Sequence, residues 1–161
     1  DKQYSSVVTT LAGYPLDKTY YQTVKGMVGA LGVLRPGGRL IIASEISEGL
    51  GSPEYVESQR RLLKMGAESF MKMIKEQRLA RVDEWQTQMQ LKAMARGSIS
   101  LYSTGLTQED GELTGVERVD SIATAVMSSV AECGDSAVAV IPEGPYVVPI
   151  YRNRGLLEAA A

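Results

Sequence analysis

The sequence predicts an α/β fold of three layers, in which helices cover both faces of a mostly parallel, Rossmann-like sheet. Short β-rich runs alternate with segments of helical periodicity along the 161 residues, which is the order typical of parallel sheets. Residues 40–43 are apolar without interruption, as expected of a strand that is buried on both faces. No stretch of linker composition divides the chain, so residues 1–161 are predicted to form a single domain.

The first predicted unit is a strand, a helix and a second strand. Residues 4–10 are rich in β-branched side chains and are predicted to form a strand. Asp17 is the expected N-cap of the following helix, because apolar and aromatic residues then recur at helical spacing over residues 20–31. A Pro-Gly-Gly turn at residues 36–38 separates this helix from the strand at 40–43.

Two helices are predicted in the middle of the chain. Ser52 as N-cap and Pro53 at the first helical position begin a helical pattern that continues to about residue 79, with a break at Gly66. Asp83 begins the next helix, which has Gln86 three residues later as its capping-box partner and ends near residue 96.

The last third of the chain is predicted to contain two strands and one helix. Residues 99–103 form a short strand, and residues 104–115 have the composition of a loop. Residues 121–133 form a helix that Gly134 closes, and residues 137–141 form the final strand.

The composition excludes several classes of function. The chain contains no histidine and a single cysteine, Cys133, so it cannot by itself form a Ser-His-Asp triad, a Cys-His dyad, a histidine-ligated metal site or an internal disulfide. Its net charge of -2 argues against a dedicated nucleic-acid-binding domain. No apolar run approaches the ~18 residues of a membrane span, so no membrane partner is expected. A lone cysteine suits a reducing compartment, which predicts a cytoplasmic protein.

The first candidate site lies at the start of the helix over residues 20–31. In parallel sheets, ligands bind at the loops beyond the carboxyl ends of the strands, and this helix follows such a loop. Tyr21, Gln22 and Lys25 lie side by side on the flank of its apolar stripe. A lysine supplies charge and a glutamine amide supplies direction, so the pair is suited to hold a carboxylate or phosphate near the helix N-terminus. A solvated helix flank is the alternative, and spacing alone favours it.

The second candidate site is the loop that follows the strand at 40–43. Its candidate ligand contacts are Glu48, Gly49, Gly51 and Ser52, together with Asp17 from the preceding loop. The glycines would let backbone amides approach a ligand. A tight connection with a capping serine is the alternative, and sequence alone favours it.

The third candidate site surrounds Trp85, the only tryptophan, in the first turn of the helix that begins at Asp83. Its indole could form the wall of a ligand pocket. A lone tryptophan more often lies in the core, because it brings a large apolar area to bury, so residue type alone favours the core.

Residues 34–42, Leu-Arg-Pro-Gly-Gly-Arg-Leu-Ile-Ile, resemble a turn found in many S-adenosylmethionine-dependent methyltransferases. That turn connects a helix to a strand and does not bind the cofactor. The glycine-rich loop that those enzymes need after the first strand is replaced here by Ala12-Gly13-Tyr14-Pro15. The resemblance therefore indicates only that the same turn chemistry recurs.

Several motifs taken together resemble the C-terminal domain of the nickel-dependent lactate racemase (LarA-like) family. They are residues 12–17 (AGYPLD), Tyr21-Gln22 followed by Lys25, residues 36–38 (PGG), residues 48–52 (EGLGS), Trp85 between Asp83 and Gln88, and residues 140–145 (VIPEGP). The resemblance extends over nearly the whole chain, and its first two motifs are the most specific.

The resemblance implies a two-domain enzyme in which this chain is the C-terminal domain and the active site lies between the domains. A nickel-pincer nucleotide would be tethered to a lysine of the N-terminal domain, which would also carry the metal-binding and acid/base histidines. The implied reaction removes a hydride from the α-carbon of lactate or another 2-hydroxy acid and returns it to the opposite face, while a base takes the hydroxyl proton.

For this chain, the resemblance implies substrate binding by Gln22 and Lys25, with Tyr21 adjacent and Trp85 as a pocket wall. It implies no catalytic residue and no metal ligand in this domain, so the isolated chain is expected to be inactive. Glu84 departs from the family pattern, in which glutamine more often precedes the tryptophan. That difference leaves the charge and the substrate preference of the pocket open.

Two other functions remain open from the sequence. A non-catalytic α/β module could use the same loops to bind an anionic ligand, and a histidine-free chain would suit it equally well. A degenerate methyltransferase is the third hypothesis, and stabilisation by S-adenosylmethionine would support it.

Overall fold

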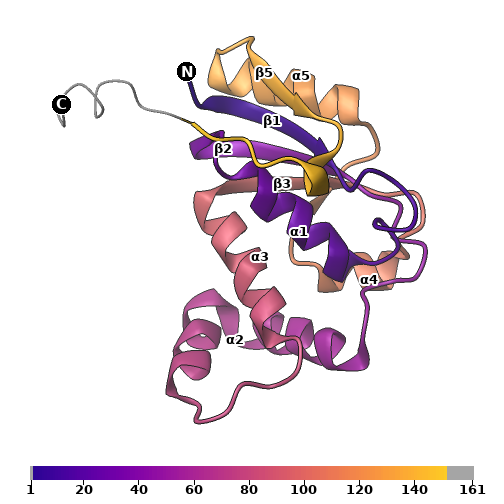
Figure 1. Ribbon diagram of the computed structural model, residues 1–161, viewed down its shortest axis with the longest axis vertical. Helices are drawn as coiled ribbons and strands as arrows, with labels where there is room; N and C mark the ends of the chain where they lie inside the picture. Colours follow the sequence, from indigo (N-terminus) through magenta and orange to yellow (C-terminus); the bar gives the residue numbers. More distant parts are fainter. Residues whose placement is uncertain (1, 152–161) are drawn as a thin grey trace, which may run out of the picture.

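The computed structural model describes residues 2–151 and contains one five-stranded sheet with the order β4-β3-β2-β1-β5 (Figure 1). All of its strand pairs are parallel. The strands are β1 (Tyr4–Thr10), β2 (Leu34–Ala43), β3 (Gly97–Tyr102), β4 (Glu117–Arg118) and β5 (Val138–Ile141). The predicted parallel α/β architecture is therefore confirmed.

Helices cover both faces of the sheet, as predicted. They are α1 (Tyr20–Ala30), α2 (Pro53–Glu76), α3 (Glu84–Arg96), α4 (Gln108–Leu113), α5 (Ile122–Cys133) and the short 3-10 helix η1 (Gly144–Tyr146). In Figure 1, α1 and α3 lie on one face of the sheet and α5 lies on the other. The helix α2 packs against α3 at the end of the molecule away from β1 and β5.

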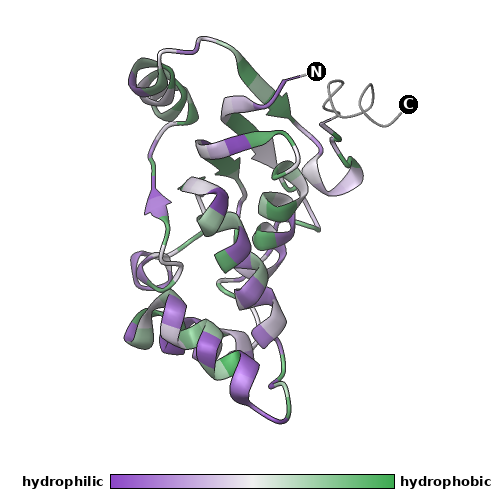
Figure 2. Cartoon of the chain, turned by 90° about the vertical axis from the view of Figure 1, so that its left-hand side faces the viewer, coloured by the Kyte–Doolittle hydropathy of each residue, from purple (hydrophilic) through white to green (hydrophobic). Residues whose placement is uncertain are grey.

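The uninterrupted apolar run of β2 divides its side chains between the two faces. Leu40 and Ile42 belong to the main core beneath α1 and α3. Ile41 instead packs with Val8 and Ala125 beneath α5, in a much smaller cluster. Figure 2 shows many hydrophobic residues along the longer strands, whereas the helices carry both hydrophobic and hydrophilic residues. Burial on both faces is the physical reason for the unbroken apolar run.

Two elements differ from the sequence-based predictions. The strand β2 begins at Leu34 rather than at residue 40, because the Pro-Gly-Gly turn is a bulge inside the strand. Tyr4 pairs with Leu34 and Ser6 with Arg39, so residues 35–38 have no partner in β1, although Gly38 pairs with Gly97 of β3. The expected loop at 104–115 contains α4, which is too short to show helical periodicity in the sequence.

The break predicted at Gly66 is confirmed. The helix α2 is regular on both sides of this residue, but Gly66 itself has φ 80 and ψ 162, outside the helical region. A left-handed φ of this kind favours glycine. The kink lets the second half of α2 place Phe70 against Leu62 and Leu91, which form a separate apolar cluster with α3.

The order of the strands places a topological switch point between β1 and β5, where ligands bind in many sheets of this type. That position is closed in this chain. A Cβ at Gly144 would lie 2.5 Å from the carbonyl oxygen of Thr10, and the Thr10 hydroxyl donates to the carbonyl of Pro142 at 2.5 Å. The candidate loops at the carboxyl edge are those that follow β1 and β2.

Replacing Gly97 with alanine is expected to destabilise the chain, because a Cβ there would overlap the carbonyl oxygen of Gly38 in β2. The φ of Gly97 is -177, which any residue adopts. A loss of stability in the Gly97→Ala variant would therefore result from the close approach of the two strands and not from backbone strain. We expect a loss of about 1–3 kcal/mol in the free energy of unfolding. Chemical denaturation measures it.

Gly29→Ala is the matched control for this substitution. Its Cβ would meet the Gly144 carbonyl oxygen at 3.4 Å, an ordinary contact, and alanine favours the helix by up to ~1 kcal/mol. Equal stability of the Gly97→Ala variant and the wild type would show that β2 and β3 are not held this closely.

Candidate functional site

The loops that follow β1 and β2 are joined to one another at the carboxyl edge of the sheet. The joined segments are residues 17–21 and 46–50, and backbone hydrogen bonds of 2.8–3.0 Å connect them. The bonds run from Ile46 to Asp17, from Glu48 to Lys18, from Tyr20 to Gly49 and from Tyr21 to Leu50, with the donor named first. The two predicted loop sites therefore form a single structure.

The first turn of α1 has its backbone donors occupied. The N–H groups of Tyr20 and Tyr21 donate to the β2 loop, and the N–H of Gln22 donates to the hydroxyl of Thr19. Thr19 is thus the N-cap of α1, and the prediction that Asp17 caps this helix is wrong. An anion at this helix would have to be held by side chains, because its first N–H groups already have partners.

Asp17 connects the two loops instead of capping the helix. Its carbonyl oxygen accepts from Ile46 N at 2.8 Å and from the Ser44 hydroxyl at 3.4 Å. Its carboxylate accepts from Glu45 N at 3.4 Å. These bonds hold the loop of β2 against the loop of β1. The role of Asp17 in the structure is therefore to connect the two loops.

The two predicted loop glycines are required by the backbone. Gly49 has φ 69 and Gly51 has φ 128, both in the region that favours glycine. A Cβ on Gly51 would also lie 3.1 Å from the Cβ of Tyr21. The glycines thus let the β2 loop turn tightly around Tyr21.

Tyr21 is the centre of the candidate site. The ammonium nitrogen of Lys25 lies 5.4 Å from the centroid of its ring. The rings of Trp85 and Tyr55 meet it edge-on, with centroids 6.0 Å and 5.2 Å away. Three of the four predicted substrate-binding residues, Tyr21, Lys25 and Trp85, are therefore neighbours in space. Gln22 is half-buried beside Tyr21 on α1.

Trp85 is half-exposed, with 50% of its surface accessible, so residue type alone pointed the wrong way when it favoured the core. Its place in the first turn of α3 puts the indole beside Tyr21 rather than under the sheet. A large apolar side chain that borders a polar loop is suited to form the wall of a ligand site.

The start of α3 is attached to the site by side chains rather than by a capping box. Asp83 has a left-handed φ of 61 and makes no capping bond, and its carboxylate accepts from the Ser52 hydroxyl at 2.5 Å. The Gln86 amide donates to the carbonyl of Tyr21 at 2.6 Å. The predicted capping box is therefore wrong, because both side chains bind other elements. Ser52 does cap α2 as predicted, accepting from Tyr55 N at 3.1 Å.

An open pocket of about 460 Å³ lies beside Tyr21. Its lining residues are Thr19, Tyr21, Glu48, Gly51, Ser52 and Asp83. Four of these were predicted from the sequence, whereas Thr19 and Asp83 were expected in other roles or not at all. Glu48 forms an ion pair with Lys18 at the pocket. Lys25 and Trp85 border the same tyrosine but are not among the lining residues.

Burial and the nearby Asp83 carboxylate both raise the pKa of Tyr21 above its ordinary value of 10.0. A hydrogen bond with Trp85 acts in the opposite direction and is the weaker influence. The phenol of Tyr21 is therefore a neutral hydrogen-bonding group at physiological pH, and it adds no negative charge beside Lys25.

Glu84 points away from the pocket and is buried between α2 and α3, with 1% of its surface exposed. Its carboxylate accepts from Arg61 at 2.7 Å, from the Gln77 amide at 2.6 Å and from Arg81 N at 3.1 Å. Its charge is thus compensated within the fold. Glu84 therefore adds no charge to the candidate site.

Comparison with known proteins identifies the family. Residues 1–149 match the family model described as "Lactate racemase C-terminal domain". The chain belongs to this family. The resemblance inferred from the sequence motifs is therefore confirmed.

The relatives that this chain matches are longer than the chain itself. The lactate racemase of Thermoanaerobacterium thermosaccharolyticum is 27% identical over 155 residues, which cover 88% of this chain and 34% of that protein. The structure of the lactate racemase apoprotein from the same organism superposes with a TM-score of 0.79 at 23% identity, over 94% of this chain and 36% of that one. The chain thus spans about a third of these relatives, and the structural match confirms its fold.

Residues 2–151 offer neither a metal cluster nor a membrane-spanning helix. No group of three or more cysteine, aspartate or glutamate side chains in this part of the chain is arranged to hold a metal ion. None of its helices combines the length and the apolar character that crossing a bilayer requires.

Acid is expected to weaken the contact between α2 and α3 through Glu84. Burial alone would raise the pKa of this carboxyl, but hydrogen bonds from Gln77, Arg81 N and Arg61 outweigh it and hold the pKa below its ordinary value of 4.5. The resulting stabilisation is fully present above the ordinary pKa of 4.5. It is lost as the pH falls through the lower pKa of the folded state. The free energy of unfolding should fall less steeply from about pH 5 to about pH 3 in Glu84→Gln than in the wild type.

Glu57→Gln is the control, because Glu57 is exposed on the same helix as Arg61. It should leave the pH dependence of the wild type unchanged. Arg61→Ala should cost about 3 kcal/mol at neutral pH, because it leaves a buried carboxylate without its cation. Identical acid unfolding curves for Glu84→Gln and wild type would contradict this account.

Proposed function

We propose that this chain is the substrate-facing, C-terminal domain of a nickel-pincer-dependent racemase or epimerase of lactate or another 2-hydroxy acid. The observation that carries the proposal is the group formed by Lys25, Tyr21 and Trp85 at the carboxyl edge of a lactate racemase C-terminal domain. A 2-hydroxy acid presents a carboxylate and a small body, and this group offers a cation beside two aromatic rings.

Lys25 is the residue proposed to bind the substrate carboxylate. It is exposed, and within residues 2–151 it forms no ion pair with an aspartate or glutamate. The neutral Tyr21 ring beneath its ammonium group holds the side chain near the site without cancelling its charge. In other proteins, the free N–H groups at a helix N-terminus bind anions. Because these groups are occupied in α1, the charge of Lys25 takes their place in the proposed site.

Gln22 and Trp85 are proposed to orient the substrate. Gln22 shares the exposed side of the first turns of α1 with Lys25, and its amide can both donate to and accept from a carboxylate or hydroxyl. Trp85 is fixed against Tyr21 by α3, whose Gln86 binds the Tyr21 carbonyl. It therefore forms a rigid apolar wall that excludes water from one side of the substrate.

The residues of this chain do not fit a nickel centre of their own. It has no histidine, and residues 2–151 contain no cluster of three ligating side chains. The nickel-pincer nucleotide, which would supply the hydride chemistry when bound, is therefore proposed to be held by the preceding N-terminal domain. The relatives, of which this chain covers about a third, have room for such a domain.

Lys25→Ala in the full-length protein is expected to lower kcat/KM for the racemised 2-hydroxy acid by about 100-fold, because it removes a charged hydrogen bond to the carboxylate. Racemisation is followed by chiral chromatography with the cofactor-loaded enzyme. Lys64→Ala, which removes an exposed lysine from α2, is the matched control and should retain wild-type kinetics. Wild-type turnover by the Lys25→Ala variant would refute the role of Lys25.

The 161-residue chain purified alone is expected to carry no stoichiometric nickel and to racemise nothing. Elemental analysis after incubation with Ni²⁺ and gel filtration measures the metal content. One nickel ion per chain would contradict the proposed division between the domains. A fragment that binds 2-hydroxy acids, together with a full-length protein that never turns them over, would favour a non-catalytic binding module.

A further inference from the structure

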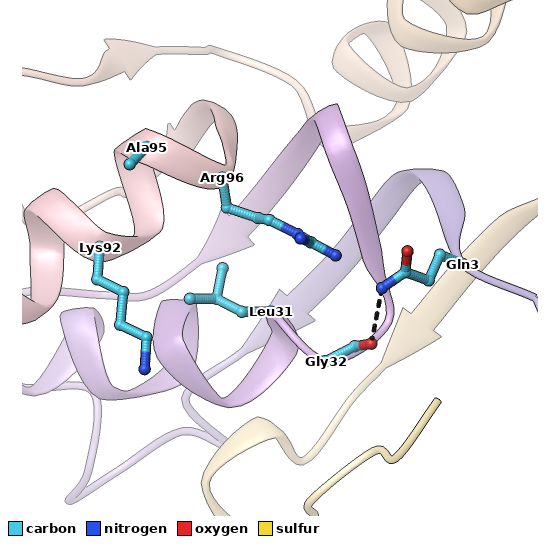
Figure 3. Close-up of a pocket in the computed structure, with 6 residues that line it drawn as sticks. All are labelled: Gln3, Leu31, Gly32, Lys92, Ala95 and Arg96. Carbon is cyan, nitrogen blue, oxygen red and sulfur yellow. Dashed lines mark hydrogen bonds between the residues drawn. The ribbon is translucent and has the colours of Figure 1, made fainter. Parts of the chain in front are cut away.

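Figure 3 shows a second open pocket, of about 430 Å³. Its lining residues are Gln3, Leu31, Gly32, Lys92, Ala95 and Arg96. Gln3 precedes β1 and Arg96 precedes β3, so the pocket is at the amino ends of the strands. It therefore cannot be part of the candidate site at the carboxyl ends.

The charge of this pocket is entirely positive. Lys92 and Arg96 lie one turn apart on α3, and none of the lining residues is acidic. Within residues 2–151, neither of them forms an ion pair with a carboxylate. The Nε of Arg96 donates to the carbonyl of Leu34 at 2.8 Å, which fixes the guanidinium and leaves its two terminal nitrogens to face the pocket.

The end of α3 explains only one of these two cations. Arg96 is in the last turn, where a cation stabilises the free carbonyl groups of the helix and where it binds the Leu34 carbonyl. Lys92 lies a full turn earlier, beyond the range over which the helix end acts. Its ammonium group extends into the pocket in Figure 3 without a partner among the residues drawn.

An apolar surface separates the two cations. Figure 3 shows the Leu31 side chain between Lys92 and Arg96, with Ala95 above them in the view on α3. Gln3 is held at the far end by a bond from its amide to the Gly32 carbonyl at 3.3 Å. A ligand that fits must therefore combine a negative group with an apolar body.

We propose that this pocket binds an organic monocarboxylate with an apolar body. The carboxylate binds the terminal nitrogens of Arg96, and the body contacts Leu31 and Ala95. The Lys92 ammonium, on the other side of Leu31, adds attractive charge. Arginine presents paired donors that match the two oxygens of a carboxylate, and lysine adds charge. The site is separate from the proposed substrate site and does not depend on the racemase activity.

The test is isothermal titration of the full-length protein with hexanoate, carried out in the Lys25→Ala background so that the substrate site does not contribute. We expect saturable binding with a Kd of about 1 mM, the range that a ligand of this size reaches. Lys92→Ala should weaken it about tenfold, and Arg96→Gln should do the same while keeping a donor for the Leu34 carbonyl. Lys75→Ala, which removes an exposed lysine from α2, is the matched control. It should leave the Kd for hexanoate within about twofold of the value for the Lys25→Ala parent.

Three results would overturn the proposal. They are the absence of saturable hexanoate binding, equal binding by the Lys92→Ala and Lys75→Ala variants, and equal binding of inorganic phosphate, which lacks an apolar body. Hexylamine is the probe of opposite charge and should not bind. Should Arg96→Gln fail to fold by circular dichroism, Lys92→Ala decides the question, because Lys92 is exposed and makes no ion pair within residues 2–151.

Discussion

The backbone hydrogen bonds between residues 17–21 and 46–50 fix the two loops on which the candidate site is built. They occupy the N–H groups of Tyr20 and Tyr21, which would otherwise be free at the start of α1. A Rossmann-like fold commonly binds anions through such free groups, at the turn between its first strand and helix. Here that turn is closed by the neighbouring loop, and the switch point beside it is closed by Gly144. We propose that anion binding at this edge relies instead on side chains, among which Lys25 supplies the charge.

Tyr21 connects this edge to the helical layer. Its backbone carbonyl accepts from Gln86, its ring contacts Trp85 and Tyr55, and its phenol lies near Asp83. The position of α3 is set in turn by the buried Glu84–Arg61 pair with α2. The charge of Glu84, whose effect on the pocket the sequence left open, thus acts in the packing of α2 against α3, the helix that carries Trp85. The two pockets also differ in charge, because carboxylates line the pocket beside Tyr21 and none lines the pocket of Lys92 and Arg96.

The errors made from the sequence share one cause, which is that a local pattern does not show a distant partner. Asp17 and Asp83 both have the composition of N-caps, yet their carboxylates bind Glu45 N and the Ser52 hydroxyl, which are about 30 residues away in the chain. Trp85 has the size of a core residue, but its place on the first turn of α3 leaves it beside a polar loop. Ser52 was predicted correctly because its partner, Tyr55 N, is three residues away and the geometry is purely local.

Periodicity, turn residues and composition by themselves determined the parallel α/β fold, the break at Gly66, the lack of histidine chemistry and the motifs that mark the family. Each of these depends on short-range spacing or on counts, which folding does not change. Only the tertiary structure decided that the loops of β1 and β2 form one site, that Tyr21 is its centre, that Glu84 is neutralised away from it, and that Lys92 and Arg96 share a pocket with Leu31. These facts depend on which segments meet across the sheet, and packing, rather than sequence spacing, sets that contact.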